Sequence, residues 1–579
     1  MKSKDKNKLR AKRIAALLIC AVMIFSAGCT LPGTNFQSNE IPESTQGKDK
    51  TMAKAADDVF SLNFNTKYSF NPLIATNHSN QLVCALVYEN MVELDNNFEV
   101  IPNIITEWEY NDDASLWTFK IDTNHYFHDG TQMTAKDLRY SLDRAINCDR
   151  YAGRFSAYQG SDFWGDDTLT VTLGVGNTQF VKLLNIPVIK SGSFDEKYPE
   201  GSGPYAYEFN IIQEDTGKKD EEDNPIMTEK MVPKLLKASE FYPGYKKLPL
   251  DTIYLKEYTK AVEVLNAFED SYIDLVVNDP SSYTNLGYAS SNEIHTFATS
   301  NMHYAVFNQE SPIFASAGIR YALQFAFDRE YLVTLLHNNA VASPLPLYPT
   351  ATYYPDTLAD KLEKDLAKCK TMLENNGVRD YDEDGFMEML NGTSDDLTIN
   401  FILCSDSSAK VGVVNRFKDD MLSIGIKVNV IELTWEDYYN ALTDYEALTK
   451  EQKEAEDFEE VEYDMYYAEV KLRNDFDISE IIQPRTDRNK YKSVNFSKST
   501  DSGYETLLYN YLAASDANRK DRYNEFCEYI LCTNPSIIVI GFEKQQIITH
   551  QGAIRGIDAN IGNPLYNFPN WQIKLKPED

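Results

Sequence analysis

The chain has 579 residues, is 43% hydrophobic and 12% aromatic, and carries a formal net charge of −32. This length is too great for one hydrophobic core, so two or three domains are expected, and the composition excludes an intrinsically disordered protein. The acidity argues against nucleic acid and anionic lipid surfaces as partners. Beyond the N-terminal region, no segment approaches the roughly eighteen apolar residues of a membrane-spanning helix.

A basic N-terminus leads into a short uncharged stretch. Residues 1–13 carry seven basic side chains and one acidic side chain, and residues 14–27 carry no charge. This stretch is too short to cross a ~30 Å hydrocarbon core, but it has the length of the apolar region of an export signal.

Small residues then lead to a thiol, in the order Ser26-Ala27-Gly28-Cys29. This string resembles the lipobox of bacterial lipoproteins, although Ser26 stands where Leu is usual. The resemblance implies a signal peptide over 1–28, a lipidated Cys29 and a flexible tether up to residue 56, with the folded part held outside the cytoplasmic membrane. An uncleaved anchor, or an ordinary signal with an incidental cysteine, is the alternative.

The first clear elements follow in the next part of the chain. Residues 116–121 alternate between apolar and polar side chains, which predicts a half-buried strand. Asp129-Gly130 predicts a turn. Thr134 and Asp137 then favour the start of a helix that runs to about residue 147, because Thr134 can cap the free amides and Asp137 complements the helix dipole.

Further helices are expected nearer the C-terminus. One begins near Ser316, with apolar residues spaced for one face at Ile319, Leu323, Phe327, Leu332 and Leu335. Two more are predicted over 501–512 and 518–532. Residues 214–224 are expected to form a charged hairpin tip, and residues 443–462 an exposed acidic helix.

The cysteines do not indicate a disulfide scaffold or a zinc site. No CxxC pair occurs, and the spacing of the last two cysteines in a predicted helix is poor for a disulfide bond. We expect free thiols, mostly buried, at Cys84, Cys148, Cys369, Cys404, Cys527 and Cys532.

No motif predicts catalysis or a cofactor. The chain lacks a HExxH metal motif, a phosphate-binding loop and a GxGxxG string. Gly201-Ser202-Gly203 does not match the GxSxG of a hydrolase. We therefore expect no catalytic residue, no cofactor and no metal centre.

One acidic string partly matches a calcium loop. Asp380, Asp382 and Asp384, followed by Gly385, copy the start of an EF-hand, but Asn391 stands where the closing Glu is expected. A proper EF-hand is therefore excluded. A weak surface calcium site or a plain polar turn is left open for residues 380–391.

Several strings together resemble a known family. They are VYENMV at 87–92, WTFKI at 117–121, FHDGT at 127–131, TAKDL at 134–138, GSGPY at 201–205 and RYALQFAFDR at 320–329. The 87–141 region resembles the signature of family 5 extracellular solute-binding proteins, the oligopeptide- and dipeptide-binding components of ABC importers. Matches in the family order extend from about Leu62 to Ile540.

The resemblance implies an α/β, periplasmic-binding-protein-like clamshell of type II, in which two lobes close over a ligand and lobe one carries an extra domain. Hinge crossings are expected near Phe307-Asn308 and Thr533-Asn534. The implied segments are 57–91, 196–306 and 533–579 for lobe one, 92–195 for the extra domain, and 307–532 for lobe two.

The resemblance also implies candidate binding residues. In peptide-binding members an Asp on lobe two pairs with the α-ammonium of the ligand, and the matching region here contains Asp475 and Asp477. The string at 472–477 departs from the glycine-rich family pattern, so both carboxylates are alternatively caps of the following helix. Aromatic residues that would line the ligand site, or else belong to the core, are Trp435, Tyr438 and Trp164.

The expected function is that of a monomeric, lipid-anchored receptor that captures peptides and delivers them to the permease subunits of an ABC transporter. Within the same class, the solute is alternatively a nickel chelate, haem or an oligosaccharide. A sensing or adhesion lipoprotein is a second class. An extracellular hydrolase is disfavoured because no nucleophile–base spacing is present.

Overall fold

The computed structural model describes residues 59–151, 153–219, 225–278, 292–389, 396–443, 461–484 and 494–574. The predicted signal peptide, Cys29, the tether and most of the acidic segment 443–462 lie outside these residues. Among the helices of the described part, none combines the length and apolar character needed to cross a membrane.

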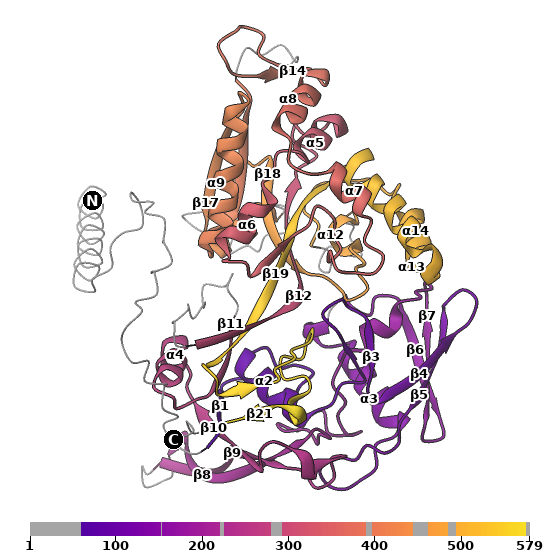
Figure 1. The fold of residues 1–579 in the computed structure, drawn as a ribbon, viewed down its shortest axis with the longest axis vertical. Coiled ribbons are helices and arrows are strands. Elements are labelled where there is room, and N and C mark those ends of the chain that lie inside the picture. The colour runs from indigo at the N-terminus through magenta and orange to yellow at the C-terminus, as the bar shows by residue number, and fades with distance from the viewer. Residues whose placement is uncertain are drawn as a thin grey trace, which may run out of the picture. The chain divides into compact units, whose positions relative to one another are not determined.

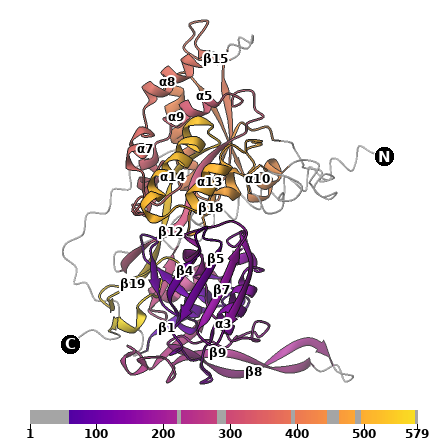
Figure 2. The same cartoon turned by 90° about the vertical axis from the view of Figure 1, so that its right-hand side faces the viewer.

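Lobe one is built on a four-stranded sheet in the order β1-β10-β9-β8, in which β1 and β10 run parallel and the other pairs antiparallel. Helix α2 packs beside β1 and starts at Asn77, whose side chain accepts the Asn80 amide. The hairpin β8–β9 projects from this sheet (Figure 2). The bounds are β1 Ser61–Phe64, α2 His78–Val87, β8 Tyr205–Lys219, β9 Pro225–Ala238, β10 Thr252–Glu257 and α4 Ala261–Glu269.

Residues 92–195, which the sequence predicts as the extra domain, contain an antiparallel sheet in the order β4-β5-β7-β6, with α3 against β6 and β7. The predicted strand at 116–121 is β5, where Trp117 and Phe119 are fully buried and stack with ring centroids 5.5 Å apart. The bounds are β4 Ile105–Tyr110, β5 Leu116–Ile121, α3 Ala135–Ala145, β6 Tyr158–Trp164 and β7 Thr168–Leu173.

Helix α3 confirms the prediction at 134–147, although it ends two residues earlier. The predicted residues, Thr134 and Asp137, form a capping box at its start. The Asp137 carboxylate accepts both the backbone amide and the hydroxyl of Thr134, at 3.0 and 2.9 Å. The acidic side chain therefore caps the helix start, because it satisfies two donors at once while facing the positive end of the dipole.

Long strands connect the two hydrophobic cores. Strands β12 (Asn292–Phe307) and β19 (Ile537–His550) pair antiparallel and run side by side (Figure 1). Phe297 packs into the core of lobe one and Met302 into that of lobe two, and the register of β12 shifts between Ala298 and Met302. Strand β12 therefore passes from one hydrophobic core to the other within its own length.

The whole sheet has the order β11-β19-β12-β18-β16-β17, with β13 also on β19. Strands β13, β16, β17 and β18 belong to lobe two, whereas Leu275 of β11 packs into the core of lobe one. Helix α9 connects the parallel strands β16 and β17 and packs on both. The bounds are β11 Leu275–Asn278, α5 Ala317–Leu323, α6 Arg329–Leu335, β13 Ala340–Ala342, α7 Asp356–Lys361, α8 Leu366–Asn375, β16 Thr398–Cys404, α9 Ser408–Ser423, β17 Lys427–Leu433, α10 Trp435–Leu442, β18 Met465–Lys471, α12 Ser479–Ile482, α13 Glu505–Leu512 and α14 Asp516–Glu528. Short two-stranded pairs complete the described fold: β2 (Val92–Leu94) with β3 (Val100–Pro102), β14 (Val378–Arg379) with β15 (Glu388–Met389), and β20 (Ile554–Arg555) with β21 (Gln572–Ile573).

The single helix predicted from Ser316 is wrong: the structure has two short helices, α5 and α6, with a break at 324–328. The break lets two side chains reach strand β19. Gln324 donates to the Ile537 carbonyl at 2.7 Å, and Arg329 donates to the Val539 carbonyl at 2.8 Å. These buried contacts satisfy strand carbonyls that a continuous helix would leave without donors.

The predictions near the C-terminus hold in outline. Helices α13 and α14 occupy the two predicted regions, and a π-helical turn at Tyr529–Thr533 ends the second. The six cysteines of the described part are free, five of them buried and Cys532 half-buried, which confirms the cysteine prediction.

Candidate binding site between the lobes

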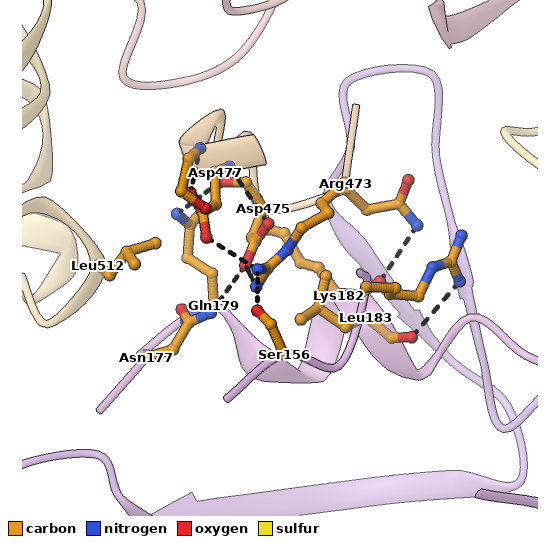
Figure 3. Close-up of polar contacts among 12 residues, drawn as sticks. Ser156, Asn177, Gln179, Lys182, Leu183, Arg473, Asp475, Asp477 and Leu512 are labelled. Carbon is orange, nitrogen blue, oxygen red and sulfur yellow. Dashed lines mark hydrogen bonds and ion pairs between the residues drawn. The ribbon is translucent and has the colours of Figure 1, made fainter. Parts of the chain in front are cut away.

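A buried ion cluster on lobe two contains both predicted carboxylates. Arg473 lies between them and donates to Asp475 Oδ2 through Nη2 and to Asp477 Oδ2 through Nη1, each at 2.8 Å (Figure 3). Asp475 is fully buried, and the other two side chains are less than one-tenth exposed. Burial opposes a charge on Arg473, but the neighbouring Asp475 and Asp477 raise its pKa above the ordinary value, so the guanidinium stays charged.

The extra domain contributes donors and acceptors to the same cluster. Asn177 donates to Asp475 Oδ2 at 2.7 Å, and Arg473 Nη1 donates to the Ser156 hydroxyl at 3.0 Å. Gln179 reaches the Asp475 carbonyl at 3.4 Å, and this carbonyl also accepts the Tyr511 hydroxyl at 2.6 Å. The cluster therefore joins lobe two to the extra domain.

The carboxylate oxygens in this cluster are all used. Asp475 Oδ1 accepts the Asp477 amide at 3.3 Å, and Asp477 Oδ1 accepts the Ser479 amide at 2.8 Å, where α12 begins. Asp477 thus accepts the first backbone amide of α12, as the alternative of a helix cap predicted. The Nε of Arg473 is buried and has no hydrogen-bond partner among the described residues. An ammonium group could reach either carboxylate only if the guanidinium moved.

A second group of cations lies next to this cluster. Lys471 ends β18, is exposed, and has no anionic partner within the described part of the chain. Partial desolvation, followed by the charges of Arg154 and Arg150, lowers its pKa below the ordinary value. Arg154 itself donates to the Asn185 carbonyl at 3.0 Å. An anionic group placed here would gain a charge partner and raise the pKa of Lys471.

A buried polar network lies further along the same strands. His303 Nδ1 lies 3.2 Å from Glu469 Oε1, its Nε2 lies 3.6 Å from Glu543 Oε2, and Lys410 contacts Glu469 at 2.5 Å. Burial lowers the pKa of His303, but the two glutamates outweigh this effect and raise it above the ordinary value. The network joins β12, β18 and β19 near the register shift.

The predicted aromatic residues lie in other places. Trp435 begins α10 and is 66% exposed, whereas Trp164 ends β6 and is 65% exposed. Tyr438 is buried, and its hydroxyl donates to the Tyr467 carbonyl at 2.6 Å. Among the described contacts, none joins these three residues to the Arg473 cluster.

A separate cavity of about 240 Å³ lies in lobe one and is lined by residues near the end of α2 and by the 563–570 segment. Glu93 lines it, is 6% exposed, and accepts the Asn90 and Asn563 side-chain amides, each at 3.0 Å. Desolvation raises the pKa of Glu93 to about 7. This cavity includes none of the predicted binding residues.

Sequence reasoning missed the partners that complete the Arg473 cluster. Arg473 lies in the same string as both aspartates, and a basic residue so close in sequence could have predicted that it pairs with them. Asn177, Gln179 and Tyr511 come from distant segments and belong to no motif, so only the fold reveals them.

The chain is similar to known binding proteins. The family model described as bacterial extracellular solute-binding proteins, family 5 middle, matches residues 99–469. The oligopeptide-binding protein AppA of Bacillus subtilis is 21% identical over 455 residues, which cover 74% of this chain and 78% of AppA.

Solved structures support the same fold. The ABC-transporter substrate-binding protein CtaP of Listeria monocytogenes superposes with a TM-score of 0.65 at 17% identity, over 89% of this chain and all of CtaP. NikZ of Campylobacter jejuni, solved in complex with Ni(L-His), gives a TM-score of 0.60 at 17% identity, over 89% of this chain and 99% of NikZ. The fold is therefore the expected two-lobe α/β clamshell, and the role is that of a receptor and not of an enzyme. The chain belongs to family 5 of the bacterial extracellular solute-binding proteins, which serve ABC importers.

Proposed function

We propose that this protein captures peptides outside the cytoplasmic membrane and delivers them to the permease of an ABC importer. The observation that carries the proposal is the polar contact at Asp475, where lobe two and the extra domain supply partners to one carboxylate. Such a contact forms only when the two parts meet, as ligand capture by closure requires. The naming of AppA as oligopeptide-binding favours peptides as the ligand.

We keep the lobe segments inferred from the sequence as part of this proposal, with one adjustment. The crossings move from 307–308 and 533–534 into the strands, to about 298–302 and 543–546, because the packing changes core there. The register shift in β12 supplies local backbone freedom at this level.

The ligand's α-ammonium would compete with Arg473 for Asp475 or Asp477. A desolvated ammonium needs a counter-charge, and these two carboxylates are already paired. Capture therefore includes displacement of the guanidinium, whose unpartnered Nε and freed Nη groups can then donate to ligand carbonyls. Lys471 provides a partner for a carboxylate on the ligand. The exposed Trp435 and Trp164 remain candidates for contact with bulky ligand side chains, whereas Tyr438 belongs to the core of lobe two.

The membrane attachment belongs to the same proposal. A lipid on Cys29, followed by the polar stretch to residue 56, would hold the receptor at the outer face of the cell membrane within reach of the permease. Metabolic labelling with a palmitate analogue, compared between the natural chain and Cys29→Ala, tests it.

The test of ligand class is thermal unfolding against peptides of two to ten residues. A ligand at about 100 times its Kd stabilises the folded state by roughly 2.7 kcal/mol. We expect a rise in Tm with free peptides, a loss of the rise on N-acetylation, and weaker binding in Asp475→Asn or Asp477→Asn. Asp419→Ala, at an exposed site on α9, serves as the control. Unchanged affinity in both Asn variants would reject the ammonium assignment.

A second candidate is a receptor for an anionic solute such as a metal chelate. The unpaired Lys471 beside Arg150 and Arg154 favours it. It predicts a Tm shift with carboxylate-rich chelates and none with peptides, and Lys471→Met would abolish that shift. The peptide proposal would then be wrong while membership of the family would stand.

A further inference from the structure

We propose that Asp380, Asp382, Asp384 and Glu388 bind a calcium ion on lobe two. The three aspartates lie in the loop between β14 and β15, and Glu388 is the first residue of β15, which pairs with β14 so that the end of the loop returns beside its start. One carboxylate oxygen from each residue lies within 4.8 Å of the others. Ligands of one Ca²⁺ ion, bound at 2.3–2.6 Å, are separated by at most about 5 Å.

The fourth carboxylate is the one that sequence analysis missed. Asn391 stands where an EF-hand has its closing Glu, but the β14–β15 pairing brings Glu388 to the cluster instead. Glu388 is 2% exposed, and its Oε2 accepts the Tyr381 amide at 2.7 Å. Its Oε1 is buried and has no partner within the described residues. A buried carboxylate oxygen without a donor is costly, and a cation at this position would satisfy it.

Backbone amides hold the aspartates while leaving oxygen atoms free. Asp380 accepts the amides of Asp384 and Gly385, at 3.1 and 3.0 Å, and Asp384 Oδ1 accepts the Phe386 amide at 2.8 Å. Gly385 has a φ of +98°, a conformation that glycine adopts without steric cost. The hydrogen bonds at Asp382 and Asp384 use Oδ1, so Oδ2 of each residue accepts none among the described residues and is available to a cation.

No basic side chain of the described residues neutralises the four carboxylates. Arg379, which precedes the loop, donates through Nε to the Glu374 carbonyl at 2.8 Å. Lys427, which lies over the Phe386 ring, pairs with Asp396. Four carboxylates this close repel one another unless a cation lies among them. Oxygen-only ligands favour Ca²⁺ over Zn²⁺, and the exposed aspartates allow waters to complete the shell.

The ion would stabilise one edge of lobe two. The loop is tied to the turn between α9 and β17, because the Met387 amide donates to the Gly425 carbonyl at 2.8 Å. The Leu397 amide donates to the Met387 carbonyl at 2.7 Å. Calcium binding would therefore raise the stability of this turn as well as that of the loop.

The test is calorimetric titration of the chelator-treated protein with CaCl₂, together with its Tm. We expect one Ca²⁺ per chain, a calcium-dependent rise in Tm, and at least a tenfold weaker affinity in Asp382→Ala. The control Asp419→Ala should bind calcium within twofold of the natural chain. A Tm that does not respond to 10 mM Ca²⁺, or equal affinity in Asp382→Ala, would overturn the proposal.

Terbium luminescence provides a readout that does not depend on stability. Tyr381 lies inside the loop and is 47% exposed, so it can transfer excitation energy to bound Tb³⁺. We expect Tb³⁺ emission that Ca²⁺ displaces and that Tyr381→Phe weakens without a change in calcium affinity. Emission that is unchanged in Asp382→Ala would place the ion elsewhere and contradict the proposal.

Discussion

The Arg473 cluster and the 380–388 loop gather acidic side chains in opposite ways. In the first, two carboxylates are buried and surround a guanidinium from the same strand end. In the second, three exposed aspartates and a buried glutamate converge without a cation from the described chain. The comparison indicates that a pair of buried carboxylates that stay ionised takes its counter-charge from the fold, whereas a mainly exposed acidic cluster can take its counter-charge from solution.

Removal of Arg473 should produce the largest effect. Arg473→Ala leaves Asp475 and Asp477 in a buried site without a cation, and we expect a loss of about 3–5 kcal/mol in the free energy of unfolding. Urea denaturation measures it.

The compensating control removes all three charges. Arg473→Met combined with Asp475→Asn and Asp477→Asn should recover most of the loss, because no unpaired charge then remains. If Arg473→Ala alone lowers the free energy of unfolding by less than about 1 kcal/mol, the buried carboxylates do not need their cation. The contrast drawn between the cluster and the loop would then be wrong.

Glu93 extends the comparison to a buried acid that pairs with no cation among the described residues. Its partners are amides, and its raised pKa of about 7 means that it keeps its proton more readily when folded. The folded state then binds more protons than the unfolded state, so stability falls as pH rises from about 4.5 to about 7 and levels off above. The shift corresponds to roughly 3 kcal/mol.

The Glu93→Gln variant tests this sign. We expect the free energy of unfolding of this variant to stay constant between pH 4.5 and 7, where that of the natural chain is expected to fall. Urea denaturation at each pH measures both. Glu109→Gln, at an exposed position on β4, should keep the decline. A decline of the same size in Glu93→Gln would assign it to other groups.

Asn177 tests the contact across the cluster, because its side chain donates to Asp475 and also accepts the Gln179 amide at 2.9 Å. Asn177→Ala removes the donor to the buried Asp475 carboxylate, and we expect a cost of about 1.5–3 kcal/mol because the acceptor is charged. Asn429→Ala removes an exposed bond between two neutral amides and should cost less than about 1 kcal/mol. Equal costs would mean that the charge of Asp475 does not strengthen the contact.

The fold could be predicted from the sequence where local patterns and tertiary packing agree. The alternation at 116–121 and the Thr134–Asp137 helix start appear in the structure because each forms its own local contacts. The prediction of one continuous helix from Ser316 was wrong. The spacing of the apolar residues contains no information about the hydrogen bonds of Gln324 and Arg329 to β19, which require a break in the helix. Such long-range hydrogen bonds leave no periodic signal in the chain.

The candidate site was also predicted only in part. The family resemblance located the segment that contains Asp475 and Asp477, but it did not indicate that Arg473 pairs with both. Asn177 comes from nearly 300 residues away, and Glu388 reaches the acidic loop only through the pairing of two short strands. Residues brought together by topology rather than by spacing could not be predicted from one sequence.

The smallest expected effect comes from an ion pair at the surface. Lys520 and Asp356 lie 3.1 Å apart, close to the distances in the Arg473 cluster, but their side chains are 51% and 73% exposed. Lys520→Ala should therefore cost less than about 1 kcal/mol, and the difference should vanish in high salt, because water and salt screen an exposed pair. Urea denaturation at low and high ionic strength measures both. Since the charges and separations are comparable, a cost near that of Arg473→Ala would mean that geometry, and not burial, sets the strength of these pairs.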